Sequence, residues 1–218
     1  AAQVKSQSSV AEHSSEVVNI PDKYLLNAML EQGDQNGDGR LTTEELKSVK
    51  EIYISDADKN EIDFTGIEYA TNLKYVYINN AKKLNHTEEL KQLTKIERLT
   101  VTGVADNDIE NIVKMESLTD LDISGSFKNI NGLEQLKKLE YLRLKSDELE
   151  DIQTLKNLDN LDELYINECK KIKDISCLKK GAYSTLGISE NIPADQVLDY
   201  EDFGDVTIQK GNFMEMFE

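Results

Sequence analysis

A spacing that recurs about every 22 residues constrains this 218-residue chain more than any other feature. From Val49 onward, an apolar residue is followed three positions later by a second one, and two positions after that by a third. The triplets are Val49/Ile52/Ile54, Leu73/Val76/Ile78, Ile96/Leu99/Val101, Leu118/Leu121/Ile123, Leu139/Leu142/Leu144, Leu161/Leu164/Ile166 and Tyr183/Leu186/Ile188. Their first members are 24, 23, 22, 21, 22 and 22 residues apart. A period this narrow indicates stacked structural repeats rather than chance.

Each repeat combines two kinds of local pattern. Its second and third apolar residues are two apart, as one face of a short strand requires. Further apolar residues, such as Leu149, Ile152 and Leu155, follow at three-residue spacing and predict a 3₁₀-like return path. One coil cannot bury its own apolar face, but stacked coils can. The sequence therefore predicts an α/β fold, a right-handed leucine-rich repeat solenoid of about seven coils of 21–24 residues.

The twelve residues 34–45 have the pattern of a calcium-binding loop between two helices. Gly39, at the sixth position, permits the sharp turn that lets oxygen ligands converge. The expected ligands are Asp34, Asn36, Asp38, the carbonyl of Arg40, Thr42 and Glu45. A solvated turn is the simpler alternative. Because sensor loops work in pairs and only one loop is visible, we expect Ca²⁺ to have a structural role.

The repeats and the loop suggest how the chain is organised. Residues 1–20 are rich in Ser, Gln and Glu and are expected to be a flexible leader. Residues 21–48 are expected to form an EF-hand-like helical cap that covers the open end of the repeats at 49–190. Residues 191–218 are expected to be a C-terminal cap or an acidic tail.

With these motifs the chain resembles bacterial internalin-type leucine-rich repeat proteins over roughly residues 21–190. That resemblance implies a secreted or cell-surface recognition protein of a Gram-positive bacterium. It also implies that a protein or glycan binds through the concave sheet. One departure is that the asparagine usual at the ninth repeat position is replaced. The residues found there are Ala57, Ala81, Val104, Ser126, Asp147 and Cys169.

Side chains at alternate strand positions should line the concave face. Five of the nine tyrosines fall there, and Tyr and Arg are residues that anchor interfaces. The predicted partner-binding residues are Tyr53, Tyr75, Tyr77, Arg98, Asp122, Tyr141, Arg143 and Tyr165. Tyrosine also simply favours strands, so a purely structural role is an equal alternative.

Composition excludes several functions. With 42 acidic and 25 basic residues, the net charge of −17 disfavours nucleic-acid binding. No apolar run is long enough to span a bilayer. The start at Ala1 without a Met fits signal-peptide removal, although a truncation would look the same. Extracellular calcium would fill a loop of roughly 10⁻⁴ to 10⁻³ M affinity, which also favours export.

Little in the sequence indicates catalysis. His13 and His86 lie in no recognisable catalytic motif. Asp120 and Asp122 share a strand face, but we expect that face to be solvated. Cys169 and Cys177 are expected to be free thiols rather than a disulfide.

We therefore expect a monomeric, non-enzymatic recognition module with Ca²⁺ in its cap. The alternative is an assembly module that binds a partner through a dockerin-like calcium loop.

Overall fold

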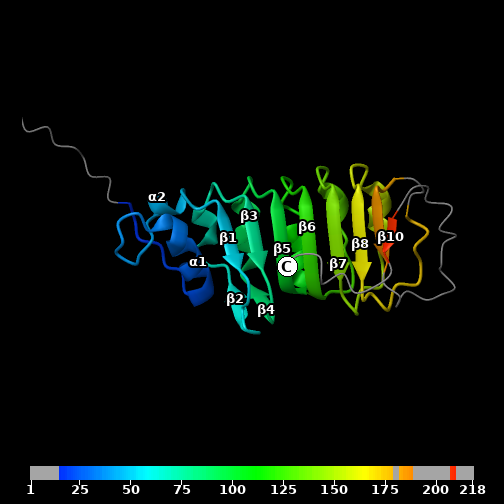
Figure 1. Cartoon of the computed structure of the whole chain (residues 1–218), viewed down its shortest axis with the longest axis horizontal. Coiled ribbons are helices and arrows are strands. Elements are labelled where there is room, and N and C mark those ends of the chain that lie inside the picture. Colours follow the sequence, from blue (N-terminus) through cyan, green and yellow to red (C-terminus); the bar gives the residue numbers. More distant parts are fainter. Residues whose placement is uncertain (1–14, 179–181, 189–206, 210–218) are drawn as a thin grey trace, which may run out of the picture.

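The computed structural model describes residues 15–178, 182–188 and 207–209, and within them the chain forms one long row of parallel strands. Neighbouring coils contribute neighbouring strands, so the row follows the order of the sequence (Figure 1). In order, the strands are β1 (Glu51–Ile54), β3 (Tyr75–Ile78), β5 (Arg98–Ala105), β6 (Asp120–Ser126), β7 (Tyr141–Lys145), β8 (Glu163–Asn167), β9 (Thr185–Ile188) and β10 (Thr207–Gln209). The repeats thus form a leucine-rich repeat solenoid, and each predicted strand-face apolar pair lies in one of these strands.

The return segments lie behind the sheet and are mostly single 3₁₀ turns, as the three-residue spacing predicted. They are η1 (Ile67–Tyr69), η2 (Thr87–Gln92), η3 (Leu133–Gln135) and η4 (Gln153–Asn157). In one coil the return segment is instead the α-helix α3 (Asp106–Ile112), which the sequence pattern did not predict. Two short strands, β2 (Glu61–Asp63) and β4 (Lys83–Asn85), pair beside the first coils.

A single apolar core runs between the sheet and the return segments, from Ile20 to Ile188. Ile52, Leu121 and Leu164 come from the strands, whereas Leu133 and Leu155 come from the return path, and all five are buried. Fully burying one such side chain stabilises the fold by about 1.5–3 kcal/mol. Because each coil shares this core with its neighbours, no coil is complete alone.

In two coils, the residue that points inward after the strand is not the one at the predicted ninth repeat position. Ser126 and Asp147 are exposed, and Phe127 and Ser146 point inward instead. The irregularity begins at β5, whose pairing with β6 shifts between Thr102 and Val104. An extra residue in the bulged strand re-aims the side chains that follow it.

Two hydroxyl groups bind backbone groups of the preceding coil near positions where the asparagine is missing. The Ser146 Oγ donates to the carbonyl of Phe127 (2.8 Å) and accepts from its N–H (3.2 Å). Two coils earlier, the Thr102 Oγ1 accepts from the N–H of Ala81 (2.7 Å). These bonds satisfy buried backbone groups between coils, as an asparagine amide would.

Two helices, α1 (Lys23–Gly33) and α2 (Thr43–Leu46), lie at the β1 end of the row (Figure 1). Asp22 caps α1, because its carboxylate accepts from the N–H groups of Tyr24 (2.8 Å) and Leu25 (3.0 Å). Near the end of α1, the Gln32 amide donates to the Glu51 carbonyl (2.6 Å) at the start of β1. Polar groups at the first strand are therefore partly covered by α1.

Residues 15–20, which the sequence analysis assigned to the flexible leader, contact the rest of the chain. The Val18 N–H donates to the Leu41 carbonyl (2.8 Å), and Ile20 is buried in the core. The polar composition of the first twenty residues did not indicate these contacts. Residues 1–14 lie outside the described part of the chain, as does most of the predicted C-terminal cap or tail at 191–218.

Cys169 and Cys177 are both buried and free, which confirms the expected thiols. Burial raises the pKa of each thiol to about 11, so both stay protonated at neutral pH. They act as small apolar side chains within the last coils.

The corrected register predicts unequal effects for two serines. Ser146→Ala should lower the free energy of unfolding by about 1–3 kcal/mol, because it leaves buried backbone groups of Phe127 without their partner. Ser126→Ala, at the exposed position, should change it by less than about 0.5 kcal/mol. Urea unfolding of the two variants measures both values, and equal losses would contradict the register.

Candidate recognition surface and ion loop

The strand register aligns the predicted partner-binding residues into two rows across the outward face of the sheet, here called the concave face. Tyr53 pairs with Tyr77 at one end of the first row, and Asp122, Arg143 and Tyr165 follow on consecutive strands. The second row contains Tyr75, Arg98 and Tyr141, with Asp120 between the last two. The structure therefore places all eight residues on one face, but it gathers them into two clusters.

The N-terminal cluster consists of Tyr53, Tyr75, Tyr77 and Arg98 on β1, β3 and β5. The rings of Tyr53 and Tyr77 stack with centroids 4.9 Å apart, and the Arg98 guanidinium lies 5.7 Å from the Tyr75 ring centre. Tyr53 is 66% exposed and Tyr75 is 38% exposed, whereas most large apolar side chains of the described residues are buried. This cluster is ordered by its own contacts while remaining open to solvent.

The C-terminal cluster consists of Asp122, Tyr141, Arg143 and Tyr165 on β6, β7 and β8. The Arg143 guanidinium lies 6.0 Å from the Tyr141 ring centre and 5.3 Å from that of Tyr165. It also contacts the Asp122 carboxylate at 3.4 Å. Tyr165 is only 7% exposed. All four residues are buried or partly buried, so they are less accessible to a partner than Tyr53 and Tyr75 of the N-terminal cluster.

Asp122 differs from the expectation of a solvated acidic pair. Burial raises the pKa of its carboxyl group to about 6, and the nearby Arg143 only partly opposes that rise. Burial likewise raises the pKa of the Tyr141 hydroxyl. Asp122 pairs with Arg143 on β7, whose guanidinium lies 3.4 Å from its carboxylate, a neighbour that spacing within one strand does not reveal.

In the predicted ion loop, backbone N–H groups donate to the carboxylate of Asp34. One oxygen of its carboxylate accepts from the N–H of Gly37 (2.8 Å), and the other accepts from the N–H of Gly39 (2.9 Å). Both glycines have φ of 74°, a conformation that other residues adopt only with strain. Asn36 and Asp38 accept in the same way from N–H groups two residues further on. These hydrogen bonds curl the loop, and each one is accepted by a side-chain oxygen of Asp34, Asn36 or Asp38.

The end of the loop is fixed by Glu45 and Thr42. The Glu45 carboxylate accepts from the N–H (3.0 Å) and hydroxyl (2.8 Å) of Thr42, which caps α2. Those bonds from Thr42 lower the pKa of Glu45, whereas the negative charge of Asp34 opposes the change. The two ends of the loop therefore lie close enough for their carboxylates to repel.

The loop fits a hard cation through the chemistry of its donors. Asp34, Asn36, Asp38, Thr42 and Glu45 offer only oxygen, which Ca²⁺ prefers. Across the described residues, no group of three His, Cys, Asp or Glu side chains is clustered in a way that could hold a metal. A complete shell would therefore also need the amide, hydroxyl and carbonyl oxygens of the loop.

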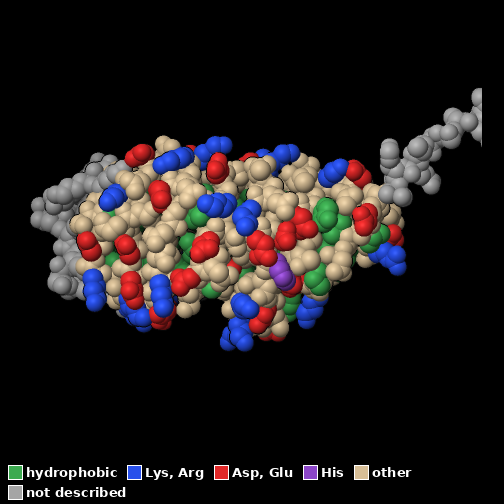
Figure 2. All heavy atoms as spheres, turned by 180° about the vertical axis from the view of Figure 1, so that it is seen from behind, with side chains coloured by type: hydrophobic (Ala, Val, Ile, Leu, Met, Phe, Trp, Pro, Cys, Tyr) green, Lys and Arg blue, Asp and Glu red, His purple; other side chains and the backbone are tan. Residues whose placement is uncertain are grey.

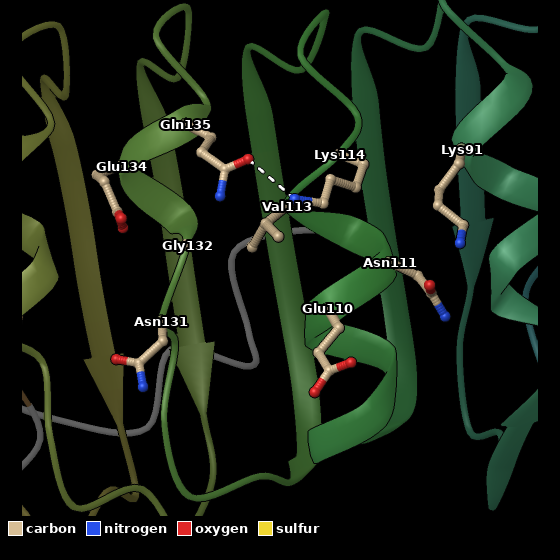
Figure 3. Close-up of a pocket in the computed structure, with 9 residues that line it drawn as sticks. All are labelled: Lys91, Glu110, Asn111, Val113, Lys114, Asn131, Gly132, Glu134 and Gln135. Atoms are coloured by element: carbon tan, nitrogen blue, oxygen red, sulfur yellow. Dashed lines mark hydrogen bonds between the residues drawn. The ribbon is translucent and has the colours of Figure 1, made fainter.

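On the opposite face, a hollow of about 620 Å³ lies between α3 and η3 (Figure 3). Glu110, Lys114 and Gln135 border it, and the Lys114 Nζ donates to the Gln135 Oε1 (3.2 Å). This whole face mixes acidic and basic side chains without a uniform patch (Figure 2). The hollow holds no pairing of a nucleophile with a base.

His86 has partners that its sequence context did not indicate. Its Nδ1 lies 2.8 Å from the Asp63 Oδ1 and 3.3 Å from the Thr65 Oγ1. The Asp63 carboxylate raises the pKa of His86. Because acid and hydroxyl contact the same ring nitrogen, the imidazole does not link them as a base in a catalytic triad does. His13 lies outside the described residues.

Comparison with solved structures identifies the fold class first. The chain has the leucine-rich repeat fold, and two bacterial internalins are among its structural neighbours. An internalin (inlF) from Listeria monocytogenes is 19% identical with a TM-score of 0.63, and the match covers 88% of this chain and 63% of that one. Internalin C2 from the same organism is 22% identical with a TM-score of 0.59, covering 88% and 94% of the two chains.

This chain therefore spans less than two thirds of the first of these internalins. No protein-family model matches it, and no curated protein matches its sequence. At these identities the likeness shows an internalin-like fold. No helix of the described residues is long and apolar enough to cross a membrane.

The partly buried carboxyl of Asp122 predicts a pH dependence of stability. Its pKa of about 6 lies above the ordinary value near 3.9. The folded state therefore keeps this proton at pH values where the unfolded state has lost it. Its contribution is greatest below about pH 4 and is lost as the pH rises through about 6, by on the order of 2–3 kcal/mol.

Asp122→Asn should remove this decline, and Asp120→Asn, which changes the same charge two residues away, should retain it. Urea unfolding between pH 4 and pH 7 measures the difference. The same decline in Asp122→Asn as in the unaltered chain would show that Asp122 titrates normally.

Proposed function

We propose that the protein is an exported, non-enzymatic recognition module that binds a protein or glycan partner on its concave face. The observation that carries this proposal is the N-terminal cluster, where Tyr53, Tyr75 and Arg98 are exposed and the half-buried Tyr77 stacks on Tyr53. Tyr and Arg side chains anchor interfaces because they offer a large apolar area together with directional polar groups. The C-terminal cluster lies further along the same face of the sheet.

Pre-ordering strengthens the case for recognition over a purely structural role. A side chain that is fixed before binding loses less conformational entropy on binding. Arg98 is held between the Tyr75 ring and the Asp120 carboxylate, at 3.6 Å from the latter. Tyr53 is two-thirds exposed, which strand pairing alone does not require.

We further propose that the loop at 34–45 binds Ca²⁺ as a structural ion and that the helical segment caps the solenoid. The oxygen donors of Asp34, Asp38 and Glu45 would hold it, and their repulsion at the loop ends would be relieved by a cation. An extracellular location, as in a protein exported from a Gram-positive bacterium, would supply the roughly 10⁻³ M calcium that such a loop needs.

Calcium should therefore raise the melting temperature. At a hundred-fold excess over Kd, a ligand stabilises the folded state by about 2.7 kcal/mol, or roughly 5–10 °C for a chain of this size. Asp34→Ala should abolish the response, whereas Asp147→Ala removes an exposed carboxylate elsewhere and should keep it. Calorimetry with calcium and with EDTA measures the shift. Equal melting temperatures in both conditions would overturn the ion site.

Partner binding should depend on the N-terminal cluster. A screen of protein and glycan arrays with calcium present identifies a partner, and Tyr53→Ala or Arg98→Ala should then weaken binding at least tenfold, as expected for anchor residues. Tyr69→Ala, an exposed tyrosine of η1 on the return path, is the control and should have little effect. Loss of binding only with loop variants such as Asp34→Ala would indicate the dockerin-like assembly module instead.

A further inference from the structure

Residues 15–20 pair with the ion loop through their backbone. The Val18 N–H donates to the Leu41 carbonyl (2.8 Å), and the Thr43 N–H donates to the Glu16 carbonyl (3.0 Å). Between these bonds, Val17 and Thr42 form an antiparallel bridge. The side chain of Val17 contributes little, since the residue is 51% exposed. The contact is thus made by the main chain, as in a pair of strands.

The same six residues also contact the first coil. Ile20 is 6% exposed within the core. Gly66, which precedes η1 and has φ of 93°, approaches so closely that a Cβ there would lie 2.8 Å from the Ile20 Cγ1 and 3.0 Å from the Asn19 carbonyl oxygen. Residues 15–20 therefore touch the loop at one end and the first repeat at the other.

The two backbone bonds lie on either side of Thr42. Thr42 is a proposed ligand, and its N–H and hydroxyl also hold the Glu45 carboxylate. Any movement of residues 16–18 away from the loop would release the peptide groups before and after Thr42. The positions of two proposed ligands thus depend on a segment that lies outside the loop.

We propose that residues 15–20 form a strap whose docking and the binding of Ca²⁺ by the loop are thermodynamically linked. This inference rests on the proposed ion site. An ion that fixes Thr42 and Glu45 favours the docked strap, and by reciprocity the docked strap strengthens ion binding by the same factor. Through Ile20 and Gly66, the strap connects the order of the loop to the first coil.

Val18→Pro tests the link, because proline lacks the N–H that Val18 donates to Leu41. Val18→Ala keeps that N–H at the same position and is the matched control. In the full chain, Val18→Pro should weaken calcium binding roughly tenfold, within the usual range of coupling between sites. Val18→Ala should bind within about twofold of the unaltered chain. Titration calorimetry with calcium alone measures all three affinities.

A second measurement needs no variant and protects the test if Val18→Pro fails to fold. In the unaltered chain, the amide of Val18 should exchange with solvent roughly tenfold more slowly when calcium is added. Equal calcium affinities in Val18→Pro and the unaltered chain, or an exchange rate that calcium leaves unchanged, would overturn the strap. If the unaltered chain binds no calcium, the proposed ion site itself fails and the link fails with it.

Discussion

The parallel register between strands of successive coils is the constraint on which the rest of the structure depends. Strand side chains alternate between two faces, so the register that buries Ile52, Val76 and Leu99 also fixes Tyr53, Tyr77 and Thr100 outside. A slip of one residue would exchange the two faces. The same apolar residues that hold the coils together therefore determine which side chains a partner can meet.

This register also explains why the acidic composition says little about the concave face. Each basic side chain there lies beside an acidic residue of its own or an adjacent coil: Arg98 with Asp120, Arg143 with Asp122, and Lys145 with Glu168. The face consequently offers aromatic surface and fixed hydrogen-bonding groups, and its basic side chains are paired with acidic ones. Recognition by such a surface rests on shape and anchor side chains more than on electrostatic attraction.

The period and the strand pattern were enough to predict the strands and the inward residues, because both follow from burying one face of a repeated unit. Features that depend on contacts between coils could not be predicted. The inward positions of Phe127 and Ser146 depend on how the strands end in their coils, which the spacing alone does not reveal. The partial burial of Asp122 beside Arg143 depends on a neighbouring strand, and the contacts of residues 15–20 depend on an edge of the ion loop. The ligand set at 34–45 rests on sequence spacing and donor chemistry and stays a prediction.

One continuous core holds both tyrosine clusters in place before a partner binds. The most direct test is urea unfolding followed by ring resonances of Tyr53 and Tyr77 at one end of the surface and of Tyr141 and Tyr165 at the other. A shared core predicts coincident midpoints for the two pairs. Separate midpoints, with one cluster released while the other stays folded, would show that the two halves of the surface are independent and would contradict the claim.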